Sequence, residues 1–192
     1  MHFKIKEYFK FLYSSTNQHG VHSPFVYNLV TKCFYNKKQT PAYTSIKSIL
    51  KRSKASVTIT YKVAKLLNRT LSYFESKRAL ILANSADSIS QILSTNNDVL
   101  IDTTVSPNSN EYDMIYMDID YFESLSDLTS LYSKTNNNSV IIINSIHNSK
   151  TSSMVWKKIK KDSHVTVTID TFFLGFVFIR KEQAKEDFII RT

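Results

Sequence analysis

The sequence predicts an α/β fold in which a mostly parallel sheet of about six strands ends in an antiparallel hairpin and follows an N-terminal helical extension. One observation is that short apolar runs alternate with helical segments from residue 79 onward, which is typical of strands buried in a parallel sheet. Another is that only a short segment separates the last two runs, which indicates an antiparallel pair. The predicted strands read ALILA, DVLID, YDMIYMD, SVIIIN, HVTVTID and FLGFVFIR.

Helices are predicted between these strands, and one glycine is assigned to the hairpin. The segments SISQIL, YFESLSDLTSLY and SKTSSMVWKKIKK have the pattern of surface helices. Gly175, one of only two glycines in the chain, is placed at the turn between the last two strands.

The N-terminal part is predicted to be helical. Ile5, Tyr8, Phe9 and Leu12 form one stripe of a first helix, and the lysines lie off this stripe. We expect the stripe to dock this helix on the domain; the alternative is that the basic helix lies on a membrane surface.

Two further helices follow in the N-terminal half. The pair Ser23-Pro24 predicts the start of a helix whose apolar stripe places Cys33 in the core. Residues 37–56 are basic and weakly patterned, and residues 60–74 form a longer amphipathic helix. We therefore predict a basic helical extension over residues 1–56 and an α/β domain over residues 57–192.

Composition limits the class of protein. The 192 residues are 42% hydrophobic and 21% charged, as in an ordinary globular domain. A single cysteine suits a reducing compartment, and neither a signal peptide nor a transmembrane run is recognised, so a cytoplasmic location is expected. With two glycines, a fold that depends on a glycine-rich phosphate loop is nearly excluded. No Ser-His-Asp order or cysteine-based zinc spacing is found.

The charge is uneven along the chain, whose net charge is +9. Residues 1–78 hold fifteen Lys or Arg and two acids, whereas residues 79–192 hold ten and fourteen. The basic half indicates an anionic partner, RNA or an acidic protein; alternatively, the lysines only solvate a helical face. The candidate contact residues are Lys47, Lys51, Arg52, Lys54, Lys62 and Lys65.

The alternating segments and the final hairpin resemble the class I S-adenosylmethionine-dependent methyltransferase fold. The blocks NQHGVHSPFVYNLVTKCFY, AKLLNRTLSYFESKRALIL, EYDMIYMDID, SVIIINSIHNSK and HVTVTIDTFFLGFVFIRKEQAKEDFIIR are similar to a group of bacterial methyltransferases, many from Bacteroidetes-type genomes, that carry a basic helical extension. The resemblance implies a Rossmann-like fold and S-adenosylmethionine as the cofactor of an active member.

The cofactor loop departs from the pattern that the family implies. In LILANSADS, Ile81, Ala83 and Asp87 occupy the positions of the family's glutamate and two glycines, so Ala83, Asn84 and Ser85 would have to hold the cofactor. Asp102 stands at the end of the next strand as a ribose ligand or, alternatively, as a solvated carboxylate. The short interval from residue 87 to residue 113 indicates that a strand and helix have been lost.

The resemblance also implies a substrate side formed by the following strands. Asp118 is the acid that would face the substrate, and Asn144 and Ser145 replace the acidic or amide metal ligands of related enzymes, which leaves a poor Mg²⁺ site and no predicted metal. His147 is the candidate general base; alternatively, it is a surface or capping residue.

Three hypotheses for function follow. The first is a methyltransferase-like pseudoenzyme with a degenerate cofactor loop and no cofactor. The second is an active small-molecule O-methyltransferase that uses S-adenosylmethionine, with Asp118 and His147 in the active site. The third is a basic scaffold that binds RNA or protein through its N-terminal half.

Overall fold

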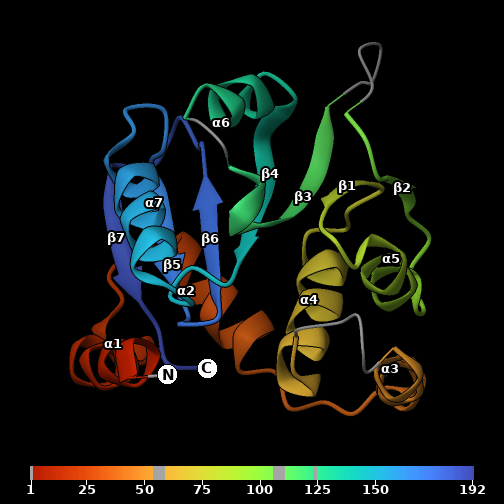
Figure 1. Cartoon of the computed structure of the whole chain (residues 1–192). Helices are drawn as coiled ribbons and strands as arrows, with labels where there is room; N and C mark the ends of the chain where they lie inside the picture. Colours follow the sequence, from red (N-terminus) through yellow and green to blue (C-terminus); the bar gives the residue numbers. More distant parts are fainter. Residues whose placement is uncertain (1, 54–58, 106–110, 123–124) are drawn as a thin grey trace.

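The computed structural model describes residues 2–53, 59–105, 111–122 and 125–192, which form a sheet covered by helices on both faces (Figure 1). The seven strands lie in the order β2-β1-β3-β4-β6-β5-β7. Neighbouring pairs are parallel from β2 to β4 and between β5 and β7, and β6 is antiparallel to both of its neighbours. The strands are β1 (Arg78–Leu82), β2 (Leu100–Asp102), β3 (Tyr112–Asp118), β4 (Thr135–Asn144), β5 (Val167–Asp170), β6 (Leu174–Phe178) and β7 (Glu186–Ile189).

The predicted fold class and all six predicted strands are confirmed, with two additions from the structure. The strand β7 was not predicted, because its sequence EDFI exposes two acids and buries only Phe188. Gly175 lies within β6 and not in the turn, which is a correction to the predicted hairpin. The turn residue with a left-handed backbone is Phe172, at φ 72°.

One face of the sheet is covered by helices from the N-terminal half and by the helix that follows β1. These are α2 (Pro24–Leu29), the π-helical turn η2 (Val30–Phe34), α3 (Pro41–Arg52), α4 (Tyr61–Tyr73) and α5 (Ala86–Ser94). Their apolar side chains pack with strand residues such as Ile81, Tyr116 and Phe176 in a single core cluster. The N-terminal helices therefore bury the same side of the sheet as α5 does.

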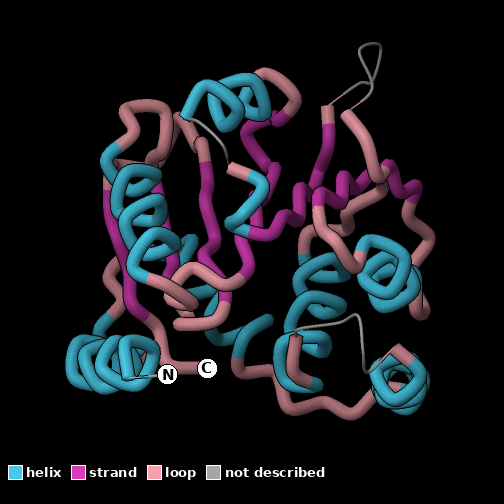
Figure 2. Tube along the Cα trace, in the orientation of Figure 1, coloured by secondary structure: helices cyan, strands magenta, loops and turns pink. Residues whose placement is uncertain are grey.

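The other face is covered by α6 (Leu125–Tyr132) and α7 (Lys150–Lys161), which follow β3 and β4 along the chain; Figure 2 shows these helices beside the strands. Strand residues on this face alternate with those of the first face, so Leu80 and Ile115 contact this second cluster. Trp156 of α7 is 1% exposed and lies directly over Gly175. A methyl group at Gly175 would be 2.7 Å from the indole ring, so β6 needs glycine here for space.

The predicted helices of the N-terminal half agree with the structure except at residues 37–56. The side chain of Ser23 accepts a hydrogen bond from the Val26 amide, and the stripe that includes Cys33 is buried. Thr60 caps α4 in the same way. The helix α3 was not predicted, because lysines and serines surround its few apolar positions; Tyr43 and Ile46 are nevertheless buried.

The first helix docks on the domain, as expected, but only in part with the predicted face. In α1 (His2–Ser14), Phe11 is the buried residue, and its ring lies 5.5 Å from that of Phe172. Phe9, a member of the predicted stripe, is 66% exposed. Tyr8, another member, packs edge-on against Phe172 at 4.8 Å, so the predicted docking face is correct only in part. After α1, Thr16 forms an isolated parallel bridge with Ile190 beyond β7.

Candidate functional site

Side chains and loops meet at the carboxyl ends of β1, β3 and β4, where parallel α/β sheets bind their ligands. Asp118 ends β3, and Asn144 ends the neighbouring strand β4 in register with it. The Asn144 amide donates a hydrogen bond of 2.9 Å to Asp118 Oδ1. The main-chain N–H of Asn84, in the loop after β1, donates to Asp118 Oδ2 at 3.3 Å. Asn84, Asp118 and Asn144, all singled out in the sequence, are therefore joined by hydrogen bonds to the Asp118 carboxylate.

The loop between β1 and α5 is a compact turn. Ala83 is 6% exposed and its carbonyl accepts a hydrogen bond from the Ala86 amide, where the helix begins. Ser85 is the residue before the helix, but its side chain makes no capping hydrogen bond. Asp87 lies in the first turn of α5, where a negative charge is favourable to the helix dipole. The side chain of Ala83 thus packs in the core cluster.

Asp102 does not join this cluster. Its carboxylate accepts hydrogen bonds from the Arg78 guanidinium at 3.0 Å and from the Tyr112 hydroxyl at 2.9 Å. Asp102 ends β2 in register with Leu80, and Leu80 pairs with Ile115, three residues before Asp118 on β3. The hydrogen bonds from Arg78 chiefly hold the pKa of Asp102 below its usual value, because they stabilise the charged carboxylate.

Asp102 should therefore support the fold in a pH-dependent way. Because its pKa is lower in the folded state, the contribution is present above about pH 4 and is lost as the pH falls through the folded value. We expect Asp102→Asn to reduce the free energy of unfolding by up to about 1 kcal/mol at pH 7, since the pair is partly exposed. Urea unfolding at several pH values should show that the difference in free energy of unfolding between the wild type and Asp102→Asn becomes smaller below pH 4. A difference that stays constant with pH would contradict this role.

His147 lies just after β4 and is held at both ring nitrogens. Its Nε2 is 2.7 Å from Asp170 Oδ2, and its Nδ1 is 3.3 Å from Ser153 Oγ. Asp170 also accepts hydrogen bonds from the Trp156 indole at 3.1 Å and from the Phe172 amide at 2.8 Å. The Phe172 ring stacks on the imidazole with centroids 5.4 Å apart.

This arrangement contains a Ser-His-Asp chain that the sequence analysis did not find. The three residues come from α7, the loop after β4, and the end of β5, and only the tertiary structure brings them together. Ser153 is 6% exposed, and its side chain lies in the second turn of a helix. These hydrogen bonds between Ser153, His147 and Asp170 therefore connect α7, the loop after β4 and β5 in the interior.

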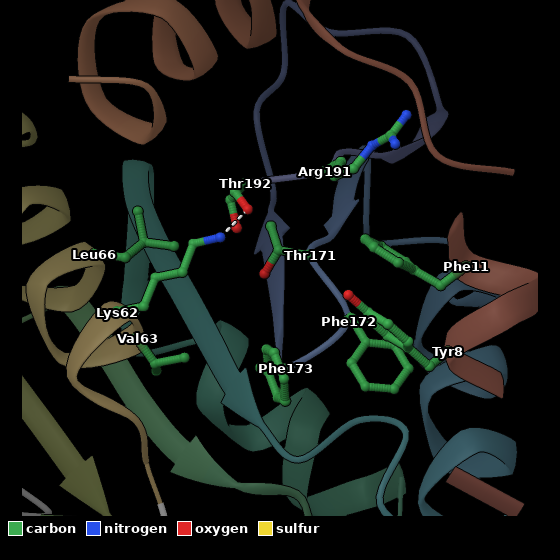
Figure 3. A pocket seen from close by; sticks show the side chains of 10 residues that line it. All are labelled: Tyr8, Phe11, Lys62, Val63, Leu66, Thr171, Phe172, Phe173, Arg191 and Thr192. Atoms are coloured by element: carbon green, nitrogen blue, oxygen red, sulfur yellow. Dashed lines mark hydrogen bonds between the residues drawn. The ribbon is translucent and has the colours of Figure 1, made fainter. Parts of the chain in front are cut away.

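Cavities and backbone strain gather around His147. Ser145 and Phe172 have left-handed backbones, at φ 65° and 72°, and the Ser145 amide donates to the Phe173 carbonyl. Such strain persists only where the surroundings impose it. His147 lines two cavities, one of about 130 Å³ beside Asn144 and one of about 160 Å³ beneath α1. A third cavity lies on the other side of Phe172 and is lined by Tyr8, Phe11 and Lys62 (Figure 3).

The predicted contact residues for an anionic partner are distributed over two helices. Lys47, Lys51 and Arg52 are exposed on α3, and the last two line an open groove between α3 and α5. Lys65 of α4 lies over the rings of Tyr43 and Tyr61, at 5.2 Å and 4.6 Å from their centroids.

Lys62 is on α4 as well, but it points to another part of the surface. Its ammonium group donates a hydrogen bond to the main-chain oxygen of Thr192 (Figure 3). Lys54 lies outside the described residues. The structure therefore groups Lys51 and Arg52 at one groove and places Lys62 apart from them.

The described residues hold no group of three or more His, Cys, Asp or Glu side chains that could bind a metal ion. The two oxygens of Asp118 accept hydrogen bonds from the Asn144 side chain and from the Asn84 amide. Within the part of the chain that the structure describes, no helix is long and apolar enough to cross a bilayer.

Several solved methyltransferase structures superpose on this chain. A putative O-methyltransferase from Klebsiella pneumoniae superposes with a TM-score of 0.54 and 9% identity over 75% of this chain and 92% of its own. The SAH-bound methyltransferase PaMTH1 from Podospora anserina gives 0.55 and 8%, over 84% and 97%. The O-methyltransferase TomG from Streptomyces achromogenes, in complex with SAM, gives 0.50 and 13%, over 86% and 99%.

The chain has a methyltransferase-like fold. This confirms the fold that the sequence resemblance implied, at the level of architecture. No family model matches the sequence, and no curated protein matches it either. The methyltransferase-like fold places Asp118 and the loop at Ala83 at the carboxyl edge of the sheet, where the Asn84 amide and the Asn144 side chain are hydrogen-bonded to Asp118.

Proposed function

We propose that the protein is a methyltransferase-like pseudoenzyme that does not bind S-adenosylmethionine and does not transfer methyl groups. The observation that carries this proposal is the engagement of Asp118. Its carboxylate accepts hydrogen bonds from the main-chain N–H of Asn84 and from the Asn144 side chain. The Asn84 N–H, a main-chain donor of the loop, is therefore already bonded to an acid of the protein. A cofactor carboxylate at this amide would have to displace Asp118 and face its charge.

The position of Asp102 supports the same conclusion. A ribose ligand needs a carboxylate that is free to reach the cofactor, but Asp102 Oδ2 already accepts hydrogen bonds from the Arg78 guanidinium and the Tyr112 hydroxyl. Ala83 stands where the resemblance places a glycine, and its methyl group packs in the core, so the loop lacks the backbone freedom that glycine would give it there. The residues present therefore do not fit the cofactor.

The environment of His147 also argues against its use as a general base. Nε2 lies within hydrogen-bond distance of Asp170 and Nδ1 within hydrogen-bond distance of the Ser153 hydroxyl, so both ring nitrogens already have a partner in the protein. Neither nitrogen is then available to a methyl acceptor unless the hydrogen bond between His147 and Ser153 breaks. The histidine acts as a connector of α7, β4 and β5.

Calorimetric titration with S-adenosylmethionine and S-adenosylhomocysteine tests the proposal. We expect no heat of binding and no shift in melting temperature at millimolar ligand. Micromolar binding would overturn the proposal and favour the active O-methyltransferase, with Asp118 and His147 as the residues to replace first. The double variant Ala83→Gly and Asp118→Asn removes the methyl group and the competing charge. If this variant binds S-adenosylmethionine and the wild type does not, Ala83 and Asp118 are the residues that prevent cofactor binding.

A second candidate function is the binding of an RNA or an acidic protein at the groove between α3 and α5. The observation in its favour is the lining, which combines Lys51 and Arg52 with hydroxyl and amide side chains. Such contacts should weaken steeply with salt, because phosphate binding releases counterions. Binding of a labelled single-stranded RNA that does not change between low and physiological salt, or that survives Lys51→Gln with Arg52→Gln, would contradict it.

A further inference from the structure

The helix α1 is attached to the domain along one side only. Phe11 is 7% exposed, and the ring of Tyr8 lies edge-on to Phe172 at 4.8 Å. The Lys4 ammonium donates to Asn148 at 3.2 Å. These contacts come from the side of the helix that faces the turn after β5, so the opposite side of α1 faces solvent.

The solvent side of α1 carries an apolar ridge. Ile5, Phe9 and Tyr13 are 46%, 66% and 94% exposed. They are spaced four residues apart, so they stand one above the other on a helix. Phe11, two residues from Phe9, lies about 200° around the helix from it. Ile5 and Phe9 of the predicted docking stripe thus lie on the surface that the fold leaves uncovered, whereas Tyr8 of the same stripe contacts Phe172.

Cations surround this ridge. Lys6 and Lys10 are exposed beside it, and the one acid of α1, Glu7, pairs with Lys10 and has a side chain only 15% exposed. The neighbouring helix α7 contains no acid, and its Lys157 lines the same cavity as Lys10. The face formed by α1 and α7 therefore combines apolar rings with positive charge.

We propose that the ridge of Ile5, Phe9 and Tyr13 docks on an anionic phospholipid surface. A short helix that presents aromatic and aliphatic side chains between lysines fits the headgroup region of a bilayer, where the rings enter the apolar boundary and the ammonium groups meet phosphates. A second copy of the chain fits less well, since burying two ridges against each other would bring Lys6 and Lys10 of both copies together. Ile5 offers no ring on which a base of RNA could stack.

Vesicle flotation with the full chain tests this proposal. Vesicles of phosphatidylcholine with phosphatidylglycerol should retain the protein, and vesicles of phosphatidylcholine alone should retain much less. The variant Phe9→Ser with Tyr13→Ser should weaken binding by at least about tenfold, because it removes apolar area that enters the bilayer. The variant Lys6→Gln with Lys10→Gln should weaken it by on the order of tenfold through the lost attraction to anionic lipid.

Two matched variants distinguish this surface from general basic or aromatic character. Lys37→Gln with Lys38→Gln removes the same charge from another exposed site, and Tyr27→Ser with Tyr121→Ser removes two exposed rings elsewhere; both should bind vesicles like the wild type. No binding by the wild type, or equal loss in all four variants, would overturn the proposal. A dimer in light scattering that disappears in the Phe9→Ser and Tyr13→Ser variant would assign the ridge to a second copy instead.

Discussion

Asp170→Ala should lower the free energy of unfolding by about 3 kcal/mol, because it leaves three donors without their acceptor in the interior. The Asp170 carboxylate is 2.7 Å from His147 Nε2, 3.1 Å from the Trp156 indole nitrogen and 2.8 Å from the Phe172 amide. Trp156 is the only tryptophan of the chain, so its fluorescence reports directly on this cluster during urea unfolding.

Two controls separate the hydrogen bonds from other effects. Asp170→Asn keeps the shape but offers one acceptor oxygen instead of two, so an intermediate loss is expected. Asp120→Ala removes an exposed acid and should change the stability by less than about 0.5 kcal/mol. An Asp170→Ala variant that unfolds at the wild-type urea concentration would show that these donors find other acceptors.

Gly175→Ala should cost about 2 kcal/mol and lower the melting temperature by roughly 4–8 °C. The added methyl group would lie 2.7 Å from two carbons of the Trp156 ring, which is 1% exposed and packed between α7 and the sheet. Neither the strand nor the ring can move away without disturbing the neighbouring strand β4, where Ile143 is the partner of Gly175. Calorimetric melting measures the effect.

The other glycine provides a matched comparison. At Gly20, the nearest atom to an added methyl group is the Thr16 hydroxyl, which belongs to a side chain that is not packed in the core. Gly20→Ala should therefore destabilise the protein less than Gly175→Ala does. Equal losses in the two variants would indicate that the indole ring does not set the requirement for glycine in β6.

The outcome for the helices shows where sequence patterns suffice. The stripe that contains Cys33 was correctly predicted, and burial raises the pKa of that thiol to about 11, as for a small core side chain. In α1 the same kind of pattern was correct only in part, since Tyr8 contacts Phe172 but Ile5 and Phe9 are exposed. A stripe shows that one side of a helix is apolar, but its contact depends on which surface lies beside it, and there Phe172 receives Phe11.

The candidate site shows a similar division. The loop at Ala83, Asp118 and Asn144 follow predicted strands, and parallel strands place their carboxyl ends at one edge, so their proximity could be predicted from order alone. The hydrogen-bond partners of the Asp102 carboxylate could not be predicted, because they are Arg78 and Tyr112, which lie at the starts of two other strands. The chain from Ser153 through His147 to Asp170 depends on how α7 crosses the sheet.

The sequence by itself determined the α/β class, six of the seven strands in the described part of the chain and the residues that could stand at the carboxyl edge, because these follow from local periodicity and chain order. The tertiary structure alone decided which hydrogen-bond partner each of those residues has, why Gly175 is glycine and which face of α1 is exposed. Each of these depends on contacts between segments far apart in the chain, such as Trp156 with Gly175 and Phe11 with Phe172, which local sequence patterns do not specify.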